Sequence, residues 1–168
     1  LTYCKIKDYK NAIPLFSQAI KIDSTNGNTY RERGKAEYLF NKFDDAKKDY
    51  GKAITINSDD VEAFYQRGIL KEKSKDPQPA IDDYTNALSI NANYENAYFN
   101  RGKLYCDQLH NYVLALGDFN KVLELNPDNN EAYFWRGKVK YNGNDFKGAN
   151  NDLSRYIDYV SDNVEALI

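Results

Sequence analysis

The sequence predicts an all-α fold: an α-solenoid of stacked antiparallel helix pairs in about five repeats. Two observations support it. An aromatic residue followed three and four positions later by Arg-Gly occurs four times, and the separations between the four glycines are 34, 34 and 35 residues. After each glycine comes a second phrase with apolar residues at i, i+4 and i+7, which lie on one face of a helix. Each such helix is amphipathic but short, so it must bury its apolar face against a neighbour.

The repeats follow each other without linkers. We expect a partial repeat at 1–26 that lacks most of its first half, full repeats at 27–60, 61–94, 95–129 and 130–163, and the start of a further helix at 164–168. The repeat at 95–129 is one residue longer, at the turn near His110 and Asn111. Turns between repeats are expected near Ser24, Ser58, Ala92, Pro127 and Ser161. Because both ends of the sequence fall inside expected helices, we expect the array to be truncated at both ends.

The four glycines indicate close helix contacts. Glycine costs roughly 1 kcal/mol relative to alanine inside a helix, so its recurrence in one register needs a reason. Gly34 is expected opposite Ala46, where two small residues let the helices of one pair approach closely. The same holds for Gly68, Gly102 and Gly137 in the later repeats.

The pattern resembles the tetratricopeptide repeat family over nearly the whole chain. The family's aromatic position holds Tyr30, Phe64, Tyr98 and Tyr133, and its second-helix positions hold Ala46/Tyr50/Ala53 and their equivalents. The resemblance implies a right-handed superhelix in which the first helices line a concave groove. One departure is that the position before the glycine, usually Leu, is Arg here.

The four arginines are matched by four aspartates at a constant place in the second helices. We expect a half-buried ladder of pairs within repeats, bidentate where geometry permits. Two alternatives are arginine stems lying over apolar surface and arginines that bind phosphate or RNA. The expected pairs are Arg33 with Asp49, Arg67 with Asp83, Arg101 with Asp118, and Arg136 with Asp152.

The resemblance also indicates which side chains could bind a partner. Groove positions of the first helices carry aromatic rings beside lysines, which suits an extended or helical peptide with apolar and acidic residues. Aromatic residues at helical spacing are also common in cores, so this is a hypothesis. The expected groove residues are Arg31, Lys35, Tyr38, Tyr65, Phe99, Asn100, Lys103, Phe134, Trp135, Lys138 and Tyr141.

Composition argues against several other functions. The net charge of −2 is a poor match for nucleic acid, and no apolar run is long enough for membrane insertion. Cys4 and Cys106 have neither zinc-site nor disulfide-framework spacing. The single histidine, His110, lies at a turn, and nucleotide-binding and hydrolase motifs are absent. We therefore expect no enzyme activity, no small-molecule substrate, no cofactor and no metal site.

The sequence thus predicts a non-catalytic scaffold whose partner is a protein or peptide. One alternative is a self-assembly module that associates through exposed repeat ends. Another is a helical repeat that binds RNA, which would require salt-dependent binding to single strands. The sequence carries no targeting signal. Its localisation is unknown, with the cytoplasm as the default.

Overall fold

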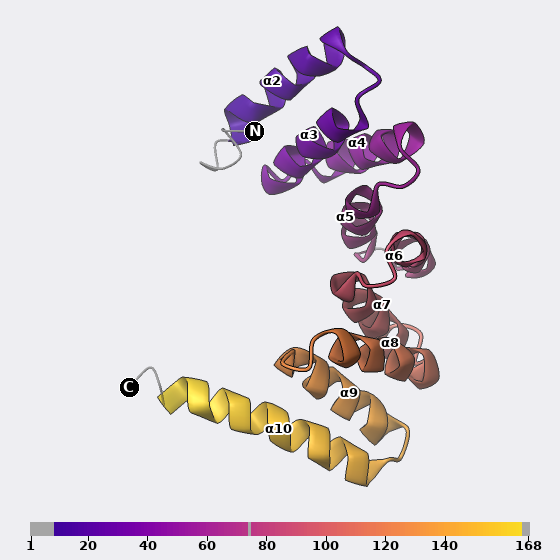
Figure 1. Ribbon diagram of the computed structural model, residues 1–168, viewed down its shortest axis with the longest axis vertical. Helices are drawn as coiled ribbons and strands as arrows, with labels where there is room; N and C mark the ends of the chain where they lie inside the picture. Colours follow the sequence, from indigo (N-terminus) through magenta and orange to yellow (C-terminus); the bar gives the residue numbers. More distant parts are fainter. Residues whose placement is uncertain (1–8, 74, 166–168) are drawn as a thin grey trace. The chain divides into compact units, whose positions relative to one another are not determined.

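The computed structural model describes residues 9–73 and 75–165, and within these residues it contains helices and no strands (Figure 1). The helices are α2 (Tyr9–Ile22), α3 (Gly27–Leu39), α4 (Phe43–Ile56), α5 (Val61–Lys71), α6 (Gln78–Ile90), α7 (Glu95–Asp107), α8 (Tyr112–Leu125), α9 (Asn130–Asn142) and α10 (Phe146–Glu165). The all-α class predicted from the sequence is confirmed. No helix in the described ranges is long and apolar enough to cross a membrane.

Asparagine and aspartate set many of the helix boundaries. Side chains of Asn26, Asp60, Asn111 and Asn129 accept a hydrogen bond from a backbone N–H in the first turn of α3, α5, α8 and α9. Within the helix pairs, the turns place Asn41, His110 and Asn144 at φ values of 61°, 50° and 65°. Asparagine and histidine enter this left-handed region more readily than most residues, so they suit these tight reversals.

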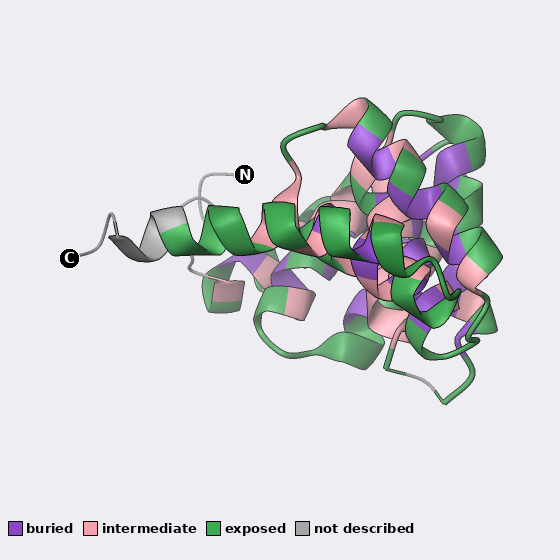
Figure 2. Ribbon diagram, turned by 90° about the horizontal axis from the view of Figure 1, so that it is seen from below, coloured by how far each residue is buried: buried purple, intermediate pink, exposed green. Residues whose placement is uncertain are grey.

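The second helices α4, α6 and α8 bury the apolar face that the spacing predicted, whereas in α10 Ala149 is buried and Leu153 and Tyr156 are half-buried. Ala46, Tyr50 and Ala53 on α4 are fully buried, as are Ala115, Phe119 and Val122 on α8. Figure 2 shows the alternation of buried and exposed positions around the helices, and it shows α10 exposed along most of its length.

The glycines lie beneath large side chains. A Cβ atom on Gly68 would lie 2.7 Å from Cε1 of Tyr84, and one on Gly137 would lie 2.8 Å from Cγ of Leu153. In the first full pair, a Cβ on Gly34 would lie 3.0 Å from the ring of Tyr50. The expected contact with a small residue is also present, because a Cβ on Gly34 would lie 3.3 Å from the carbonyl oxygen of Ala46. The close approach therefore also makes room for the large residue of the second helix.

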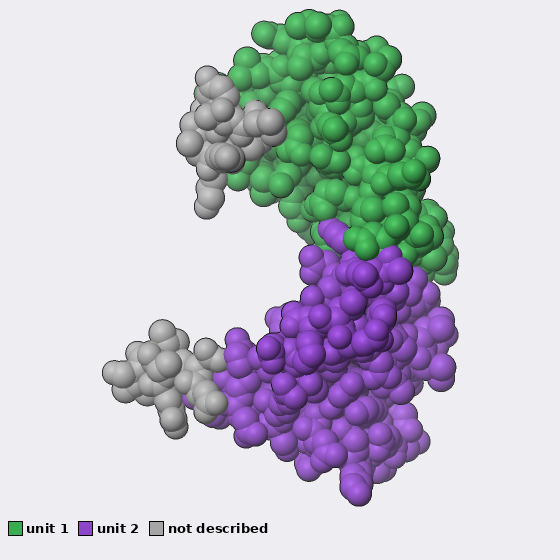
Figure 3. Space-filling view, in the orientation of Figure 1, with its two compact units in different colours: residues 1–91 green, residues 92–168 purple. Residues whose placement is uncertain are grey.

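The chain forms two compact units, residues 1–91 and 92–168 (Figure 3). In the first unit, α3 packs against α4 and α5 against α6, with α2 against α3 and α4 against α5. In the second unit, α7 packs against α8 and α9 against α10, with α8 against α9. Each unit is thus a stack of antiparallel helix pairs, which is the all-α solenoid that the sequence predicted.

The C-terminal boundary differs from the sequence expectation. A turn was expected near Ser161 and a new helix from residue 164, but α10 continues through Ser161 to Glu165. Helices α4, α6 and α8 end on Asn57, Asn91 and Asn126 in an extended conformation or close to it. Val160 occupies the corresponding place in α10. Without a residue there that competes for backbone hydrogen bonds, the helix continues. Residues 166–168, which were expected to lie in the further helix, are outside the described residues.

Candidate partner-binding surfaces

The four arginines and four aspartates singled out in the sequence lie together as four bidentate pairs, each within one repeat. Arg33 donates from Nε to Asp49 at 2.6 Å and from Nη2 at 2.7 Å. The pairs Arg67–Asp83, Arg101–Asp118 and Arg136–Asp152 have the same two-bond geometry at 2.7–2.9 Å. The aspartates are buried and the arginine side chains are 16–22% exposed. The pairs therefore join the two helices of each repeat below its surface.

Each of these guanidinium groups also lies near the aromatic ring three residues earlier. The distance from Cζ to the ring centroid is 5.7 Å for Arg33 and Tyr30, and 5.3 Å for Arg136 and Tyr133. The other two pairs have 5.7 and 5.6 Å. Cation–π attraction favours this geometry. The repeated aromatic and Arg-Gly phrase thus places a ring, a cation and a close helix crossing at one level of each repeat.

The residue four positions after each arginine differs between repeats. Its charge changes the environment of the paired aspartate. Lys140 donates to Asp152 at 2.8 Å, and Lys71 donates to Asp83 at 2.7 Å. Burial acts to raise the pKa of Asp152, but hydrogen bonds from Arg136 and Lys140 outweigh it and lower the pKa. For Asp118 burial is the larger effect and the pKa is raised, because Arg101 is its sole cationic partner in the described structure.

In the first full repeat this position is Glu37, a carboxyl group buried beside Asp49. Its Oε1 lies 3.9 Å from Nε of Arg33, and its Oε2 is buried without a hydrogen-bond partner among the described residues. Burial, followed by the charge of Asp49, raises the pKa of Glu37 to about 7. Two carboxyl groups thus share one guanidinium here, and the site favours a proton on one of them.

The second unit carries a group of exposed and half-buried rings and lysines, which we call the aromatic–lysine cluster: Phe99, Lys103, Phe134, Trp135 and Lys138. Trp135 stacks on the buried ring of Phe119 at 6.2 Å and an interplanar angle of 18°. Phe134 packs edge-on against Trp135 at 5.8 Å and is 37% exposed. The rings are anchored on the core side, and part of their surface remains in solvent.

Both lysines of the cluster lie over its rings. Nζ of Lys103 is 5.6 Å from the ring of Phe99 and 5.7 Å from that of Trp135. Nζ of Lys138 is 4.6 Å from Trp135 and donates to Asp107 at 2.8 Å. The hydrogen bond to Asp107 raises the pKa of Lys138, so this lysine is held as a cation. The cluster can thus offer apolar ring edges and positive charge together.

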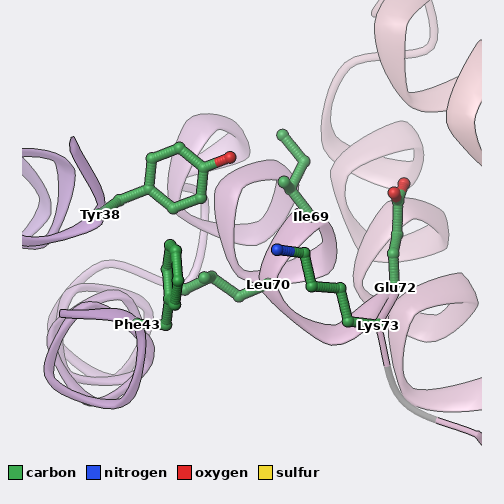
Figure 4. Close-up of a pocket in the computed structure, with 6 residues that line it drawn as sticks. All are labelled: Tyr38, Phe43, Ile69, Leu70, Glu72 and Lys73. Atoms are coloured by element: carbon green, nitrogen blue, oxygen red, sulfur yellow. The ribbon is translucent and has the colours of Figure 1, made fainter. Parts of the chain in front are cut away.

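The first unit has a smaller candidate site, the Tyr38–Phe43 pocket, with a volume of about 260 Å³ (Figure 4). The two rings meet edge to face at 5.7 Å, and α5 supplies Ile69 and Leu70. Nζ of Lys73 lies 5.0 Å from the ring of Phe43. Figure 4 shows Lys73 directed toward the phenyl ring, while Glu72 points away from it. This pocket combines aromatic walls with one cation, whereas the cluster has two.

The other expected groove residues have varied environments. Arg31 donates to Asp60 at 2.9 Å, and Asp60 also caps α5, so Arg31 joins α3 to the start of α5. Lys35 is exposed and Asn100 is half-buried. Tyr65 packs against Tyr84 at 5.7 Å. Tyr141 is 59% exposed and meets Phe146 at 5.5 Å. A partner-binding role for these residues stays a prediction.

Several contributing residues were missed in the sequence. Phe43 and Phe146 were not selected, although each lies five residues after a selected tyrosine across the turn, and that recurrence was a usable signal. Leu70, Lys73 and Asp107 were also missed. Asp107 pairs with Lys138 of another repeat, and no local spacing indicates that contact.

The histidine and the cysteines are residues with potential for catalysis or metal binding, and packing and turn geometry account for His110 and Cys106. His110 occupies its left-handed turn position, with its ring 6.3 Å from that of Tyr112. Cys106 is a buried free thiol whose pKa is raised to about 11 by burial. Cys4 lies outside the described residues. Across the described residues no group of three or more potential metal ligands occurs.

Stacked helix pairs with a repeated aromatic, arginine and glycine at one level define a helical-repeat solenoid. The sequence model of the tetratricopeptide repeat matches residues 1–26, 61–94 and 95–129, which is more than half of the chain. The chain belongs to the tetratricopeptide repeat family. The matched ranges coincide with three of the repeats inferred from the glycine spacing.

Solved structures show the same fold. A crystal structure of MamA has a TM-score of 0.87 at 22% identity, covering 98% of this chain and 95% of that one. YrrB, described as a tetratricopeptide repeat protein with an unusual peptide-binding site, has a TM-score of 0.83 at 22% identity, covering 99% of this chain and 85% of that one. The tetratricopeptide repeat domain of Arabidopsis OM64 has a TM-score of 0.64 at 26% identity, covering 68% of this chain and 94% of that one.

Proposed function

We propose that the chain is a non-catalytic scaffold that binds a peptide segment of a partner protein through the first helices of its repeats. The observation that carries this proposal is the aromatic–lysine cluster. Hairpin packing alone explains the buried ring of Phe119, but it does not require Phe134 to be 37% exposed next to Trp135, whose ring lies under two lysines. Binding sites are enriched in such aromatic anchors, because rigid rings bury a large area at a small entropic cost.

The chemistry of the cluster specifies the peptide. Lys103 has no anionic partner among the described residues, whereas Lys138 has one in Asp107. An apolar side chain would cover the edges of Phe134 and Trp135, and an acidic side chain next to it would pair with Lys103. The Tyr38–Phe43 pocket of the first unit is a separate apolar position with Lys73 beside it. The proposed ligand is therefore a peptide with alternating apolar and acidic residues. YrrB, whose described site binds peptide, lends support at the level of the fold.

The test selects peptides from a displayed random library and measures their affinity by calorimetry. Phe134→Ala and Lys103→Gln should each weaken binding about tenfold or more, the range expected for an anchor residue. Val113→Ala is the matched control, because Val113 is 81% exposed on α8 and is no part of the cluster. The proposal fails if library selection yields no acidic-apolar consensus, or if the control weakens binding as much as the cluster variants.

A second candidate function is self-association through α10. Its solvent side carries Ile157 at 60% exposure and Val160 at 39%, three residues apart on one face. Light scattering over a dilution series separates the two functions. Self-association is favoured if the mass of the wild-type chain falls to that of a monomer on dilution and the Ile157→Lys variant has the monomer mass at every concentration.

A further inference from the structure

The arginine ladder has a third donor in each repeat, and its partner varies. Nη1 of Arg33 donates to Oγ of Ser17 at 3.1 Å, and Nη1 of Arg136 donates to Oδ1 of Asn120 at 3.0 Å. Ser17 and Asn120 occupy the same repeat position on the preceding second helix. For Arg67 that position is Gly51, which offers no side-chain acceptor.

The space left by Gly51 is open toward Arg67. A Cβ atom on Gly51 would have one neighbour, Nη1 of Arg67, at 3.7 Å. Nε and Nη2 of Arg67 are both used by Asp83, and Nη1 has no acceptor among the described residues. A half-buried guanidinium N–H that lacks an acceptor favours a ligand that supplies one.

Four cations surround this opening. A cleft of about 620 Å³ is lined by Arg67 and Lys71 on α5 and by Asp44, Lys47 and Lys48 on α4. Three carboxylates lie among these cations: Asp44 lines the cleft, Asp83 pairs with both Arg67 and Lys71, and Asp45 lies 4.0 Å from Lys48. Four cations against three carboxylates leave an excess of one positive charge, in a chain whose net charge is −2. The cleft shares no lining residue with the Tyr38–Phe43 pocket.

The second unit shows that packing does not require this basic character. A cleft between α8 and α9 that also reaches Asp145 shares three equivalent positions with the first cleft, and there Val113, Leu116 and Lys140 stand in place of Asp44, Lys47 and Lys71. There Asn120 also satisfies Nη1 of the arginine. Both clefts lie between a second helix and the first helix of the next repeat. Of the two, only the cleft between α4 and α5 has the two additional lysines and an arginine N–H without an acceptor among the described residues.

We propose that the cleft between α4 and α5 is a binding site for a phosphate-type oxyanion, independent of the peptide-binding surface. Nη1 of Arg67 would donate to one phosphate oxygen, and the exposed ammonium groups of Lys47 and Lys48 would pair with the others. Lys71 is already bound to Asp83 and contributes charge. Inorganic phosphate and a phosphoserine side chain present the same chemistry, and the cleft has room for either.

The experiment titrates inorganic phosphate into the isotope-labelled chain at about pH 8, where phosphate is mainly a dianion. Chloride holds the ionic strength constant. Backbone amide shifts should saturate and be confined to α4 and α5. Gly51→Asn, which copies the residue of the second unit, should weaken binding about tenfold through loss of one charge-assisted hydrogen bond. Asparagine is a better helix former than glycine and has room here, so this variant should fold.

Three further variants make the result decisive. Lys47→Gln with Lys48→Gln should reduce binding by at least the same factor, whereas Lys121→Gln on α8 should leave it unchanged. Asn120→Gly frees Nη1 of Arg136 where Leu116 and Gly117 replace the two lysines, and it should create no phosphate site. Shifts that do not saturate, or that are equal in wild type and Gly51→Asn, overturn the proposal.

A second arm identifies the source of the anion. A short phosphoserine peptide and its unphosphorylated form are titrated in the same way. Tighter binding of the phosphopeptide than of inorganic phosphate, again lost in Gly51→Asn, assigns the site to a phosphorylated protein segment. Equal or weaker binding assigns it to the free ion. Binding of the unphosphorylated peptide with equal affinity contradicts an oxyanion site.

Discussion

Glu37 gives the most informative test of the electrostatics inside the repeats. The variants are Glu37→Gln, which removes the titrating group, and Glu37→Lys, which copies Lys71 and Lys140 of the other repeats. In the native chain Glu37 as a residue is 6% exposed, and it lies beside Asp49. The pKa of Glu37 rises from 4.5 to about 7 through burial first and the charge of Asp49 second.

The sign of the pH dependence follows from which state binds the proton. Between 4.5 and about 7 the folded chain holds this proton and the unfolded chain does not, so this group's contribution to stability falls as the pH rises. Each pKa unit corresponds to about 1.4 kcal/mol, so the contribution lost across this window is on the order of 3 kcal/mol. Below 4.5 both states are protonated and the contribution is complete.

The assay is urea unfolding of wild type and variants at several pH values, with a carbon-13 titration of the Glu37 carboxyl group. The free-energy difference between Glu37→Gln and wild type should be small at low pH, grow in favour of the variant up to about pH 7, and stay constant above it. Glu37→Lys should be more stable than wild type at pH 7 by pairing with Asp49. Glu124→Gln, an exposed control, should show no such trend. A Glu37 carboxyl group that titrates at its ordinary value, with a pH-independent difference, would refute the reasoning.

Two other predictions concern the repeated motif. Gly68→Ala should destabilise the chain by about 1–2 kcal/mol in urea unfolding, because the Cβ atom would lie 2.7 Å from the buried ring of Tyr84 and overpacking outweighs the gain in helix propensity. Gly117→Ala is its control and should stabilise by roughly 0.5–1 kcal/mol, since no atom lies within 4 Å of the added Cβ; equal effects of the two variants contradict the packing argument. Arg101→Leu and Asp118→Leu should each cost about 3–5 kcal/mol, while the double variant should recover most of the loss. A double variant that is no more stable than the worse single variant would show that the cost of each single variant does not come from leaving its partner's charge buried and unpaired.

The fold could be predicted from the sequence because its determinants are local and repeated. Glycine spacing gave the repeat boundaries, and the stripe of Ala46, Tyr50 and Ala53 gave the buried face. Where a local determinant changed, the prediction failed. Val160 replaces a helix-ending asparagine, and α10 therefore runs past the expected turn.

The candidate sites were predicted less completely, because they depend on contacts between repeats. The rings of the second unit were identified by their position on the first helices. Asp107 of one repeat holds Lys138 of the next, and Gly51 of one repeat decides whether Arg67 of the next has a free donor. Such contacts join residues about one repeat or half a repeat apart, and they emerge only when the helices are packed together.

Trp135 reports directly on whether the aromatic–lysine cluster binds a partner peptide. This residue is the single tryptophan of the chain and packs against Phe134 and beneath Lys138. Titration with an acidic-apolar peptide selected from the library should change the indole emission in a saturable way, with the same affinity that calorimetry gives. Calorimetric binding that leaves the emission of Trp135 unchanged would contradict the assignment of the cluster as the binding surface.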